Sequence, residues 1–436
     1  MASEWPRHAL SDLCDSIVDC PHSTPKWTER GVVVLRNQNI KNGRLDLSSP
    51  SYTDEEHYEQ RSRRARLQAG DLVITREAPM GEVCMVPDGL KCCLGQRMVM
   101  LRPNDGKAMG RYLLYSLQSR QVQHEIKVNE GTGSTVSNLR IPLLKALPIP
   151  TPPLPVQQRI ADVLGKLDDK IELNRRMNRT LEKMAAAIFK SWFIDFDPVH
   201  AKAAPGNGPD PASGGLPAEI ADLFPDTFED SDLGPIPKGW TPGKLADVAD
   251  NPRRTVQPSD VAPTTPYIGL QHMPRRCIAL DAWGRADEVG SGKSHFKEGE
   301  ILFGKLRPYF HKVGIAPVDG VCSTDILVVV PKSLEWHSYV LSLVSSQAFV
   351  DYTDSHSAGT KMPRTNWKDM GRYPLALPPE PLAKAFQDHV AALHQRIGLA
   401  VRQNRRLAGL RDTLLPELLN GEIELPEAEA IAEEVA

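Results

Sequence analysis

An internal repeat constrains the fold of this chain more than any other feature. Four blocks of similar sequence occur twice, in the same order, at offsets that drift slowly from 235 to 226 residues. They pair Trp5–Leu13 with Trp240–Val248, Gly70–Val73 with Gly299–Leu302, Gly131–Leu139 with Gly359–Trp367, and Pro152-Pro153 with Pro378-Pro379. The last offset then holds without a gap through Leu181 and Leu407. This order indicates a duplication, in which both copies share one structural plan.

Each copy has the same internal organisation. A part of about 150 residues mixes short apolar, β-rich runs with turns, a proline-rich stretch follows, and a long helical pattern ends the copy. We predict an α+β chain in which two globular α/β heads are separated by two long helices that form an antiparallel coiled coil, giving an internal pseudo-twofold repeat. The predicted boundaries are 1–153 and 236–379 for the heads, 154–194 and 380–421 for the helices, 195–235 for a linker and 422–436 for an acidic tail. The linker is rich in Ala, Gly, Pro and Asp and is expected to run over the surface.

The two helical segments carry matching apolar seams. In both, the seam residues alternate in steps of three and four, which is typical of a coiled coil. The seam residues are Ile160, Leu164, Leu167, Ile171, Asn174, Asn178 and Leu181 in the first segment, and Phe386, Val390, Leu393, Ile397, Ala400, Asn404 and Leu407 in the second. Asn178 and Asn404 occupy equivalent positions, where a buried Asn can fix the register of the pair; a solvated or capped Asn is the alternative. Arg411 interrupts the second seam.

The charge is divided unevenly, although the net charge is only −3. Residues 201–235 contain seven acids and one base, and residues 417–436 contain seven acids and no base. The rest of the chain then holds 41 acidic and 51 basic residues, a balance of +10 that is compatible with nucleic-acid binding. The seven cysteines lack any CxxC spacing and are expected to be reduced thiols. The sequence shows neither a membrane-spanning run nor a signal-peptide pattern, so we expect a cytoplasmic protein.

The helices and the linker closely resemble the specificity subunits of type I restriction-modification enzymes. The residues that carry this resemblance are Pro155–Ala161, Leu167–Asn174, Phe189–Val199, Leu223–Asp226 and Ile236–Trp240. The resemblance implies that the heads are target-recognition domains, each reading one half of a split, asymmetric DNA site. It also implies that the helices set the unread gap and dock two methyltransferase subunits, and that restriction/translocase subunits join the complex. The second copy departs from the pattern, since Pro381–Lys384 lacks the Gln157-Gln158-Arg159 run.

Candidate DNA contacts are Lys, Arg, Asn and Gln residues of the heads, because these side chains bind phosphates and base edges. In the first head they are Arg36, Asn37, Gln38, Asn39, Arg61, Arg63, Arg64, Arg66 and Arg76. In the second head they are Arg253, Arg254, Gln271, Arg275, Arg276, Lys293, Lys305, Arg307, Lys361 and Arg364. Trp283, Tyr309 and Phe310 could stack on DNA, but core packing is the favoured interpretation for these aromatic residues. Charge clusters that are merely solvated are the alternative.

The chain lacks the motifs of the reactions that such an enzyme performs. No glycine-rich cofactor turn with an Asn-Pro-Pro-aromatic motif, no GxxxxGK[ST] loop and no HExxH motif is found. We therefore expect no catalytic residue, metal or cofactor in this chain; S-adenosylmethionine, ATP and Mg²⁺ would belong to partner subunits. Asp88, Glu125 and Lys127 loosely match a metal-dependent nuclease pattern. A stand-alone nuclease and a coiled-coil protein adaptor are thus the alternatives to a DNA-specificity subunit.

Overall fold

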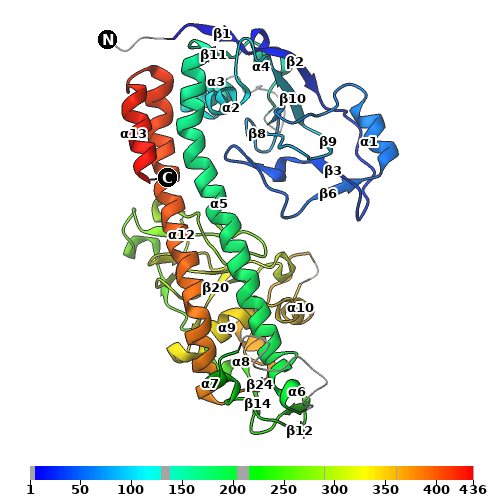
Figure 1. Ribbon diagram of the computed structural model, residues 1–436, viewed down its shortest axis with the longest axis vertical. Helices are drawn as coiled ribbons and strands as arrows, with labels where there is room; N and C mark the ends of the chain where they lie inside the picture. Colours follow the sequence, from blue (N-terminus) through cyan, green and yellow to red (C-terminus); the bar gives the residue numbers. More distant parts are fainter. Residues whose placement is uncertain (1–4, 129–137, 204–215, 289, 360, 436) are drawn as a thin grey trace. The chain divides into compact units, whose positions relative to one another are not determined.

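The computed structural model describes residues 5–128, 138–203, 216–288, 290–359 and 361–435, which form two compact units (Figure 1). The first unit contains Met1–Lys170 and Leu407–Ala436, and the second contains Ile171–Arg406. Each unit therefore combines one head with part of each long helix. The chain is assembled from mixed α and β elements, as the repeat predicts.

The first head is built on short strands that surround apolar cores. A four-stranded antiparallel sheet has the order β2-β10-β7-β8, and a three-stranded sheet has the order β6-β3-β9, in which β3 and β9 are parallel. β1 pairs with β11, and β4 with β5. The strands are β1 Arg7–Ala9, β2 Cys14–Asp19, β3 Val32–Leu35, β4 Ile40–Lys41, β5 Arg44–Leu45, β6 Ser51–Thr53, β7 Leu72–Thr75, β8 Val83–Met85, β9 Cys92–Leu94, β10 Met98–Pro103 and β11 Pro148–Pro150. The helices are α1 Glu55–Ser62, α2 Gly110–Gln118, α3 Arg120–Val128 and α4 Ile141–Lys145.

The second head repeats this topology. Its four-stranded sheet has the order β15-β23-β20-β21, and its five-stranded sheet, β16-β19-β22-β17-β18, contains the parallel pair β17 and β22. β14 pairs with β24, and β12 with β13. The strands are β12 Phe228–Ser231, β13 Gly234–Pro237, β14 Thr241–Lys244, β15 Ala249–Asp250, β16 Thr255–Val256, β17 Pro266–Ile268, β18 Gly284–Arg285, β19 Lys293–Phe296, β20 Ile301–Gly304, β21 Val313–Ile315, β22 Gly320–Cys322, β23 Ile326–Pro331 and β24 Pro374–Leu377. The helices are α8 Leu245–Val248, α9 His337–Val344, α10 Gln347–Ser355 and α11 Trp367–Met370.

The correspondence between the heads covers their four-stranded sheets and one parallel pair of strands. β2, β10, β7 and β8 match β15, β23, β20 and β21, and the parallel pair β3/β9 matches β17/β22. β7 is fully buried as Leu72–Thr75 and β20 is fully buried as Ile301–Gly304, which explains why the Gly-acid-apolar block is among the repeated segments. The duplication is therefore present in the fold as well as in the sequence.

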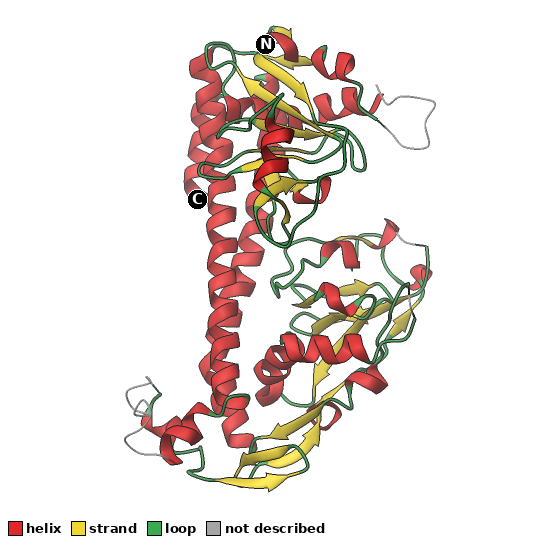
Figure 2. Ribbon diagram, turned by 90° about the vertical axis from the view of Figure 1, so that its right-hand side faces the viewer, coloured by secondary structure: helices red, strands yellow, loops and turns green. Residues whose placement is uncertain are grey.

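Two long helices follow the heads: α5, Leu154–Phe193, and α12, Glu380–Asn420. Each begins directly after a Pro-Pro pair, and Pro is disfavoured inside a helix but compatible with its start. Gly421 ends α12 with a left-handed backbone (φ 69°), the usual conformation after a helix C-terminus. The expected seam residues are buried, except for Leu181 and Leu393, which are half-buried. In Figure 2 these uninterrupted helices contrast with the short strands and loops of the heads.

The two helices contact each other in both units, and the contacts in the second unit show that they run antiparallel. In the first unit, Asp168 of α5 meets Arg411 of α12. In the second unit, Asn174 meets Asn404, and further along α5 the ring of Phe193 lies 5.0 Å from that of Phe386. Residues later in α5 thus meet residues earlier in α12. This is the direction that the matched seams predict.

The linker and the tail are more ordered than their composition indicates. Asp197–Ala203 form α6 and Ala218–Ala221 form α7, and Val199 and Phe224 are buried in the core of the second unit. The expectation that the whole linker runs over the surface is therefore wrong, because its apolar ends pack against Trp192 and its neighbours. In the acidic tail, Leu425–Val435 form α13, whose Ala428 and Ala432 are fully buried. Glutamates lie on its other faces, so a high acid content did not prevent helix packing.

Candidate nucleic-acid interface

The second head brings several candidate cations together at the ends of its sheets. Lys305 follows β20, and its backbone N–H donates to the Asp325 carbonyl (2.9 Å) while its carbonyl accepts from Thr365 N–H (3.0 Å). The Arg307 N–H donates to the Pro363 carbonyl (2.8 Å). The loop after β20 and the loop that carries Lys361 and Arg364 therefore lie side by side. Arg364 also forms an ion pair with Asp325.

An aromatic turn lies beside these cations. Pro308–Phe310 form a short 3-10 helix between Arg307 and His311, both of which have left-handed backbones (φ 52° and 51°). The Arg275 guanidinium lies 4.0 Å from the centre of the Phe310 ring, and the Arg276 N–H donates to the His311 carbonyl. Arg275 and Arg276 thus join the basic loops. We call Arg275, Arg276, Lys305, Arg307, Lys361 and Arg364 the basic surface of the second head.

Tyr309 corrects one sequence-based expectation. Its side chain is 48% exposed, so core packing is not its role in this structure. Phe310 is half-buried and contacts the Tyr309 ring at 4.8 Å. Trp283, by contrast, packs against the core of the second unit. The Arg405 guanidinium lies over its ring, 3.8 Å from the ring centre.

The first head places its candidates differently. The arginine cluster divides: Arg63, Arg64 and Arg66 are exposed, but Arg61 is only 6% exposed and donates to the carbonyls of Leu94 and Ser23. Arg76 follows β7 and is held by Asp19 (2.8 Å), Asn138 and the Leu139 carbonyl. The guanidinium groups of Arg61 and Arg76 are thus used inside the head.

The segment Arg36–Asn39 lies next to the Arg76 loop. The Asn37 side-chain amide donates to the Glu77 carbonyl, and Asn39 is buried, accepting from the Arg36 N–H (3.0 Å) and donating to the Asp46 carbonyl. Arg36 and Gln38 are exposed. Of these candidates, Arg36 and Gln38 are therefore available to solvent, whereas Asn39 fixes the turn.

The remaining candidates of the second head are not part of the basic surface. Arg254 forms a two-pronged ion pair with Glu300, with both contacts at 2.8 Å. Lys293 is 5% exposed and donates to the Ser291 backbone and hydroxyl. Arg253 is exposed, with a left-handed backbone (φ 45°), and Gln271 is exposed in the turn after β17.

The helix seam of the second unit contains one layer of polar side chains between apolar layers. The Asn174 amide donates to Asn404 Oδ1 and Gln403 Oε1, each at 2.9 Å. Asn178 and Asn404 are 2% and 3% exposed, so the alternative of solvated asparagines is wrong for both. An aromatic layer of Phe189, Trp192, Phe193, Tyr339 and Phe386 follows, with neighbouring ring centres 4.9 to 6.0 Å apart. Any other register of the two helices would place these asparagines opposite apolar residues, so they favour the observed register.

The second head is fastened to α5 by buried polar contacts within the same unit. Glu182 accepts from the Ala279 N–H (3.2 Å) and the Cys277 thiol (3.4 Å), and burial raises the pKa of its carboxyl. Arg175 pairs with Asp281 (2.6 Å). Sequence reasoning missed these residues, because their partners are far away along the chain.

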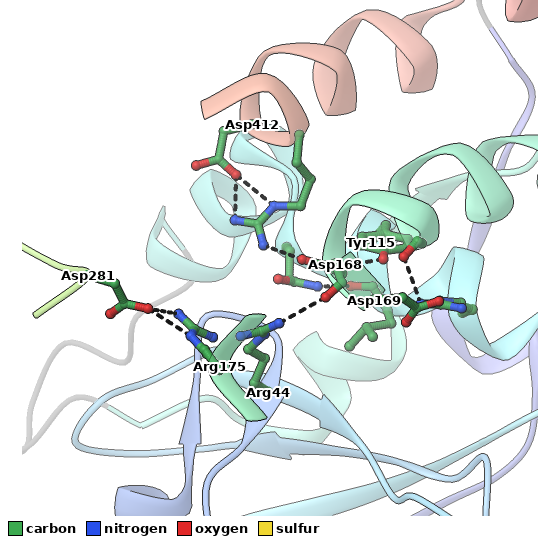
Figure 3. Close-up of polar contacts among 12 residues, drawn as sticks. Arg44, Tyr115, Asp168, Asp169, Arg175, Asp281 and Asp412 are labelled. Carbon is green, nitrogen blue, oxygen red and sulfur yellow. Dashed lines mark hydrogen bonds and ion pairs between the residues drawn. The ribbon is translucent and has the colours of Figure 1, made fainter. Parts of the chain in front are cut away.

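The polar seam of the first unit centres on Asp168. Its Oδ1 accepts from Arg411 (2.7 Å), its Oδ2 accepts from the Tyr115 hydroxyl (2.8 Å), and its backbone carbonyl accepts from Arg44 (3.2 Å). Burial, followed by the nearby Asp168 charge, raises the pKa of Tyr115, so the phenol keeps its proton and donates. Figure 3 shows Tyr115 and Arg44 approaching Asp168 from different elements. Arg411, which interrupts the apolar pattern, is thus a paired residue that links α12 to α5 and α2.

The Gln157-Gln158-Arg159 run also has partners inside the first unit. Gln157 is fully buried; its side chain accepts from the Met109 N–H (3.0 Å) and donates to the Pro152 and Lys107 carbonyls. Arg159 forms a two-pronged ion pair with Glu429 of α13. In the second unit, Gln387 accepts from the Ser338 N–H instead. The second copy therefore fastens its head to the helix with a different glutamine.

The nuclease-like residues do not form a visible metal site. Asp88 lies in an exposed turn after β8, and Glu125 and Lys127 lie on α3. Within the described ranges, no group of three His, Cys, Asp or Glu side chains could hold a metal ion. Residues 131–137 of the repeated block Gly131–Leu139 lie outside the described residues. Among the described helices, none has the length and apolar character needed to cross a membrane.

The chain is similar in sequence to specificity subunits of type I restriction enzymes. Residues 2–183 match the family model described as "Type I restriction modification DNA specificity domain". The chain is 26% identical over 369 residues to the type I restriction enzyme MjaIX specificity subunit of Methanocaldococcus jannaschii, covering 82% of this chain and 78% of that protein. It is 25% identical over 405 residues to the HindI specificity subunit of Haemophilus influenzae, covering 82% and 87%. A crystal structure of a type I S subunit from M. genitalium aligns over 95% of this chain and 96% of that chain, with 15% identity and a TM-score of 0.49.

Proposed function

Because this chain is a member of the type I restriction-modification specificity-subunit family, we propose that it selects the DNA sequence on which the complex acts. Each head would read one half of a bipartite, asymmetric site. The observation that carries this proposal is the duplicated head topology, with exposed cations and glutamines on the loops at the sheet ends. The role is recognition, and the proposal assigns no reaction to this chain.

The chain acts as a subunit of a larger complex, and the identity of its partners belongs to the proposal. Two methyltransferase subunits would dock on the paired helices, and restriction/translocase subunits would join them. S-adenosylmethionine, ATP and Mg²⁺ would be bound by those partners. Leu173 of α5 and Leu399 of α12 are each 53% exposed, so these helices retain apolar side chains that a docked subunit could cover.

Methylation mapping tests the proposal directly. The chain is co-expressed with a type I methyltransferase subunit from its own genome, and N6-methyladenine is located across the host DNA. A single split motif with a fixed unread gap, absent without this chain, is the expected result. Absence of new methylation, although both proteins are soluble and associated, would overturn the proposal and favour the protein-adaptor alternative.

The affinity for a cognate duplex is expected to fall steeply with salt. Cations that neutralise phosphates release counterions, so the logarithm of the affinity falls linearly with the logarithm of the salt concentration, with a slope of about −0.9 per phosphate contact. With six to ten contacts, the affinity should fall by about 10³- to 10⁵-fold between 50 and 200 mM salt. Fluorescence anisotropy with a labelled duplex measures this slope. A flat response would contradict DNA binding through the basic loops.

Shortening both helices together is expected to change only the unread gap. Residues 175–181 of α5 face 397–403 of α12 in the antiparallel register, so deleting both segments removes one heptad from each helix. Seven helical residues span about 10 Å, which corresponds to roughly three base pairs. Methylation mapping should show a shorter gap between unchanged half-sites. Deletion of 175–181 alone is the control, because it breaks the register and should abolish methylation.

A further inference from the structure

We propose that Gln38 and Gln271 are matching base-reading residues, each recognising an A·T pair in the half-site of its own head. This inference rests on the proposed function and names the residues that carry part of its specificity. It starts from a 3-10 turn that occurs once in each head. The sequence repeat alone does not reveal this turn, because the residues around the glutamine differ in chemistry between the two heads. The segments are Arg36-Asn37-Gln38-Asn39 and Gly269-Leu270-Gln271-His272.

Both segments follow the equivalent parallel strand. In the first head, β3 leads into a 3-10 helix at Asn37–Asn39, and in the second head, β17 leads into one at Leu270–His272. A backbone bond from the neighbouring strand closes each junction: the Gly95 N–H donates to the Leu35 carbonyl (2.8 Å), and the Ser323 N–H donates to the Ile268 carbonyl (3.0 Å). The two turns therefore leave their sheets in the same way.

The last residue of each four-residue segment, Asn39 or His272, holds the shape of the turn in the same manner. The Asn39 side chain accepts from the Arg36 N–H at 3.0 Å, and the His272 ring accepts from the Gly269 N–H at 3.1 Å. The returning backbone bonds, from Asn39 N–H to the Arg36 carbonyl and from His272 N–H to the Gly269 carbonyl, measure 2.8 and 2.9 Å. Because different side chains produce one geometry, the turn is a maintained feature of both heads, and it presents its middle residue in a defined place.

The middle residue of each 3-10 helix is a glutamine, Gln38 or Gln271. It is the only residue that the two four-residue segments share, and it is exposed in both heads. Glutamine has an adjacent donor and acceptor in its amide group, which match the N6 and N7 positions of adenine in the major groove. In the second head, the Gln271 side chain also forms a hydrogen bond with Tyr267, which holds the amide beside the turn. In the second head, the Gln271 amide lies over Gly269, where an added Cβ would come within 2.3 Å of Oε1. The absence of a side chain at Gly269 therefore leaves room for Gln271.

The surroundings of both turns suit a nucleic-acid surface. The loop after β7 holds the first turn through Asn37 and the Glu77 carbonyl. The loop after β20 holds the second turn through Lys312, whose ammonium donates to the Leu270 carbonyl (2.6 Å). This second loop also carries Lys305 and Arg307 of the basic surface. The turn that carries Gln271 is thus anchored to a loop that bears candidate phosphate contacts, and the exposed Arg36 flanks the turn that carries Gln38. Phosphate contacts fix the position from which a base is read.

The test is methylation mapping with single substitutions in the full chain, co-expressed with its methyltransferase partner. We expect Gln38→Ala to relax one A·T position in one half-site, and Gln271→Ala to relax one A·T position in the other. Loss of a bidentate contact should reduce the discrimination at that position by about 5- to 150-fold. Gln38→Glu should disfavour adenine at the same position, because its carboxylate accepts hydrogen bonds and offers no donor.

Gln68→Ala and Gln257→Ala are the matched controls, since both glutamines are exposed in the same heads but lie outside these turns. They should leave the motif unchanged. An unaltered motif in both Gln38→Ala and Gln271→Ala, with the unmodified chain directing methylation normally, would overturn this inference and leave the proposed function intact. Relaxation of both half-sites by one substitution would also overturn it. If the unmodified chain directs no methylation, the proposed function itself fails.

Discussion

Replacing Asp168 with alanine is expected to lower the free energy of unfolding of the first unit by about 3–5 kcal/mol, the usual effect of breaking a buried ion pair. The Asp168 and Arg411 side chains are only 20% and 15% exposed, so water cannot readily replace the lost carboxylate. The substitution also leaves the Tyr115 hydroxyl and the Arg411 guanidinium without their shared acceptor. Because Arg411 keeps an exposed contact with Asp412, the lower end of the range is expected.

Urea unfolding followed by circular dichroism measures this effect. The neighbouring Asp169→Ala variant is the matched control: Asp169 is 68% exposed and pairs with Arg111, so its loss should cost about 0–1 kcal/mol. A combined Asp168→Leu and Arg411→Leu variant should recover part of the lost stability, since apolar residues can replace a buried ion pair. The recovery stays incomplete because the Tyr115 hydroxyl still lacks its acceptor. Equal destabilisation by Asp168→Ala and Asp169→Ala would show that Asp168 does not organise the seam.

This polar seam illustrates which features of the fold can be predicted from sequence. The heptad pattern identifies the apolar seam because a helix repeats its geometry at every turn, so Leu164 or Val390 can be placed without knowing anything else. Arg411 stands out from the same pattern as an interruption. Its partner cannot be found in this way, because Asp168 lies 243 residues away along the chain and faces Arg411 only once the two helices pair.

The candidate DNA contacts show the same limit in the heads. Sequence composition selects Arg61 and Arg63 equally, but the fold buries Arg61 against the Leu94 carbonyl and leaves Arg63 in solvent. Short irregular strands lack a strong period, so the face to which a loop residue points depends on tertiary packing. For the same reason, Tyr309 was assigned to the core, although it lies exposed beside the basic surface.

The prediction that the linker runs over the surface was wrong for a different physical reason. Average composition hides a few large apolar residues among many small and acidic ones. Val199 and Phe224 are separated by an Ala-, Gly- and Pro-rich stretch, yet both reach the core of the second unit. A single Phe or Val can anchor a segment whose other residues are solvated, because burial of one such side chain contributes about 1.5–3 kcal/mol.

Neutralising part of the basic surface should weaken DNA binding by about 100-fold without changing the sequence that is preferred. The combined variant Arg275→Gln, Lys305→Gln and Lys361→Gln removes three cations, of which Arg275 and Lys361 are exposed and Lys305 is half-buried. Each charge near a phosphate contributes about 1 kcal/mol in water, and about 1.4 kcal/mol corresponds to a factor of ten. The salt slope should become shallower by about 2.7, which is three contacts at about 0.9 each.

A control with the same change in net charge separates local contacts from general attraction. Lys238, Lys244 and Lys332 are exposed in the same unit and lie outside the basic surface, so their combined replacement by Gln should leave the salt slope nearly unchanged. Anisotropy titrations at several salt concentrations, with cognate and unrelated duplexes, measure both quantities. Equal slopes for the two triple variants would mean that the cations act only through net charge. A changed sequence preference in the first variant would mean that these cations read bases, because phosphate contacts weaken all sequences alike.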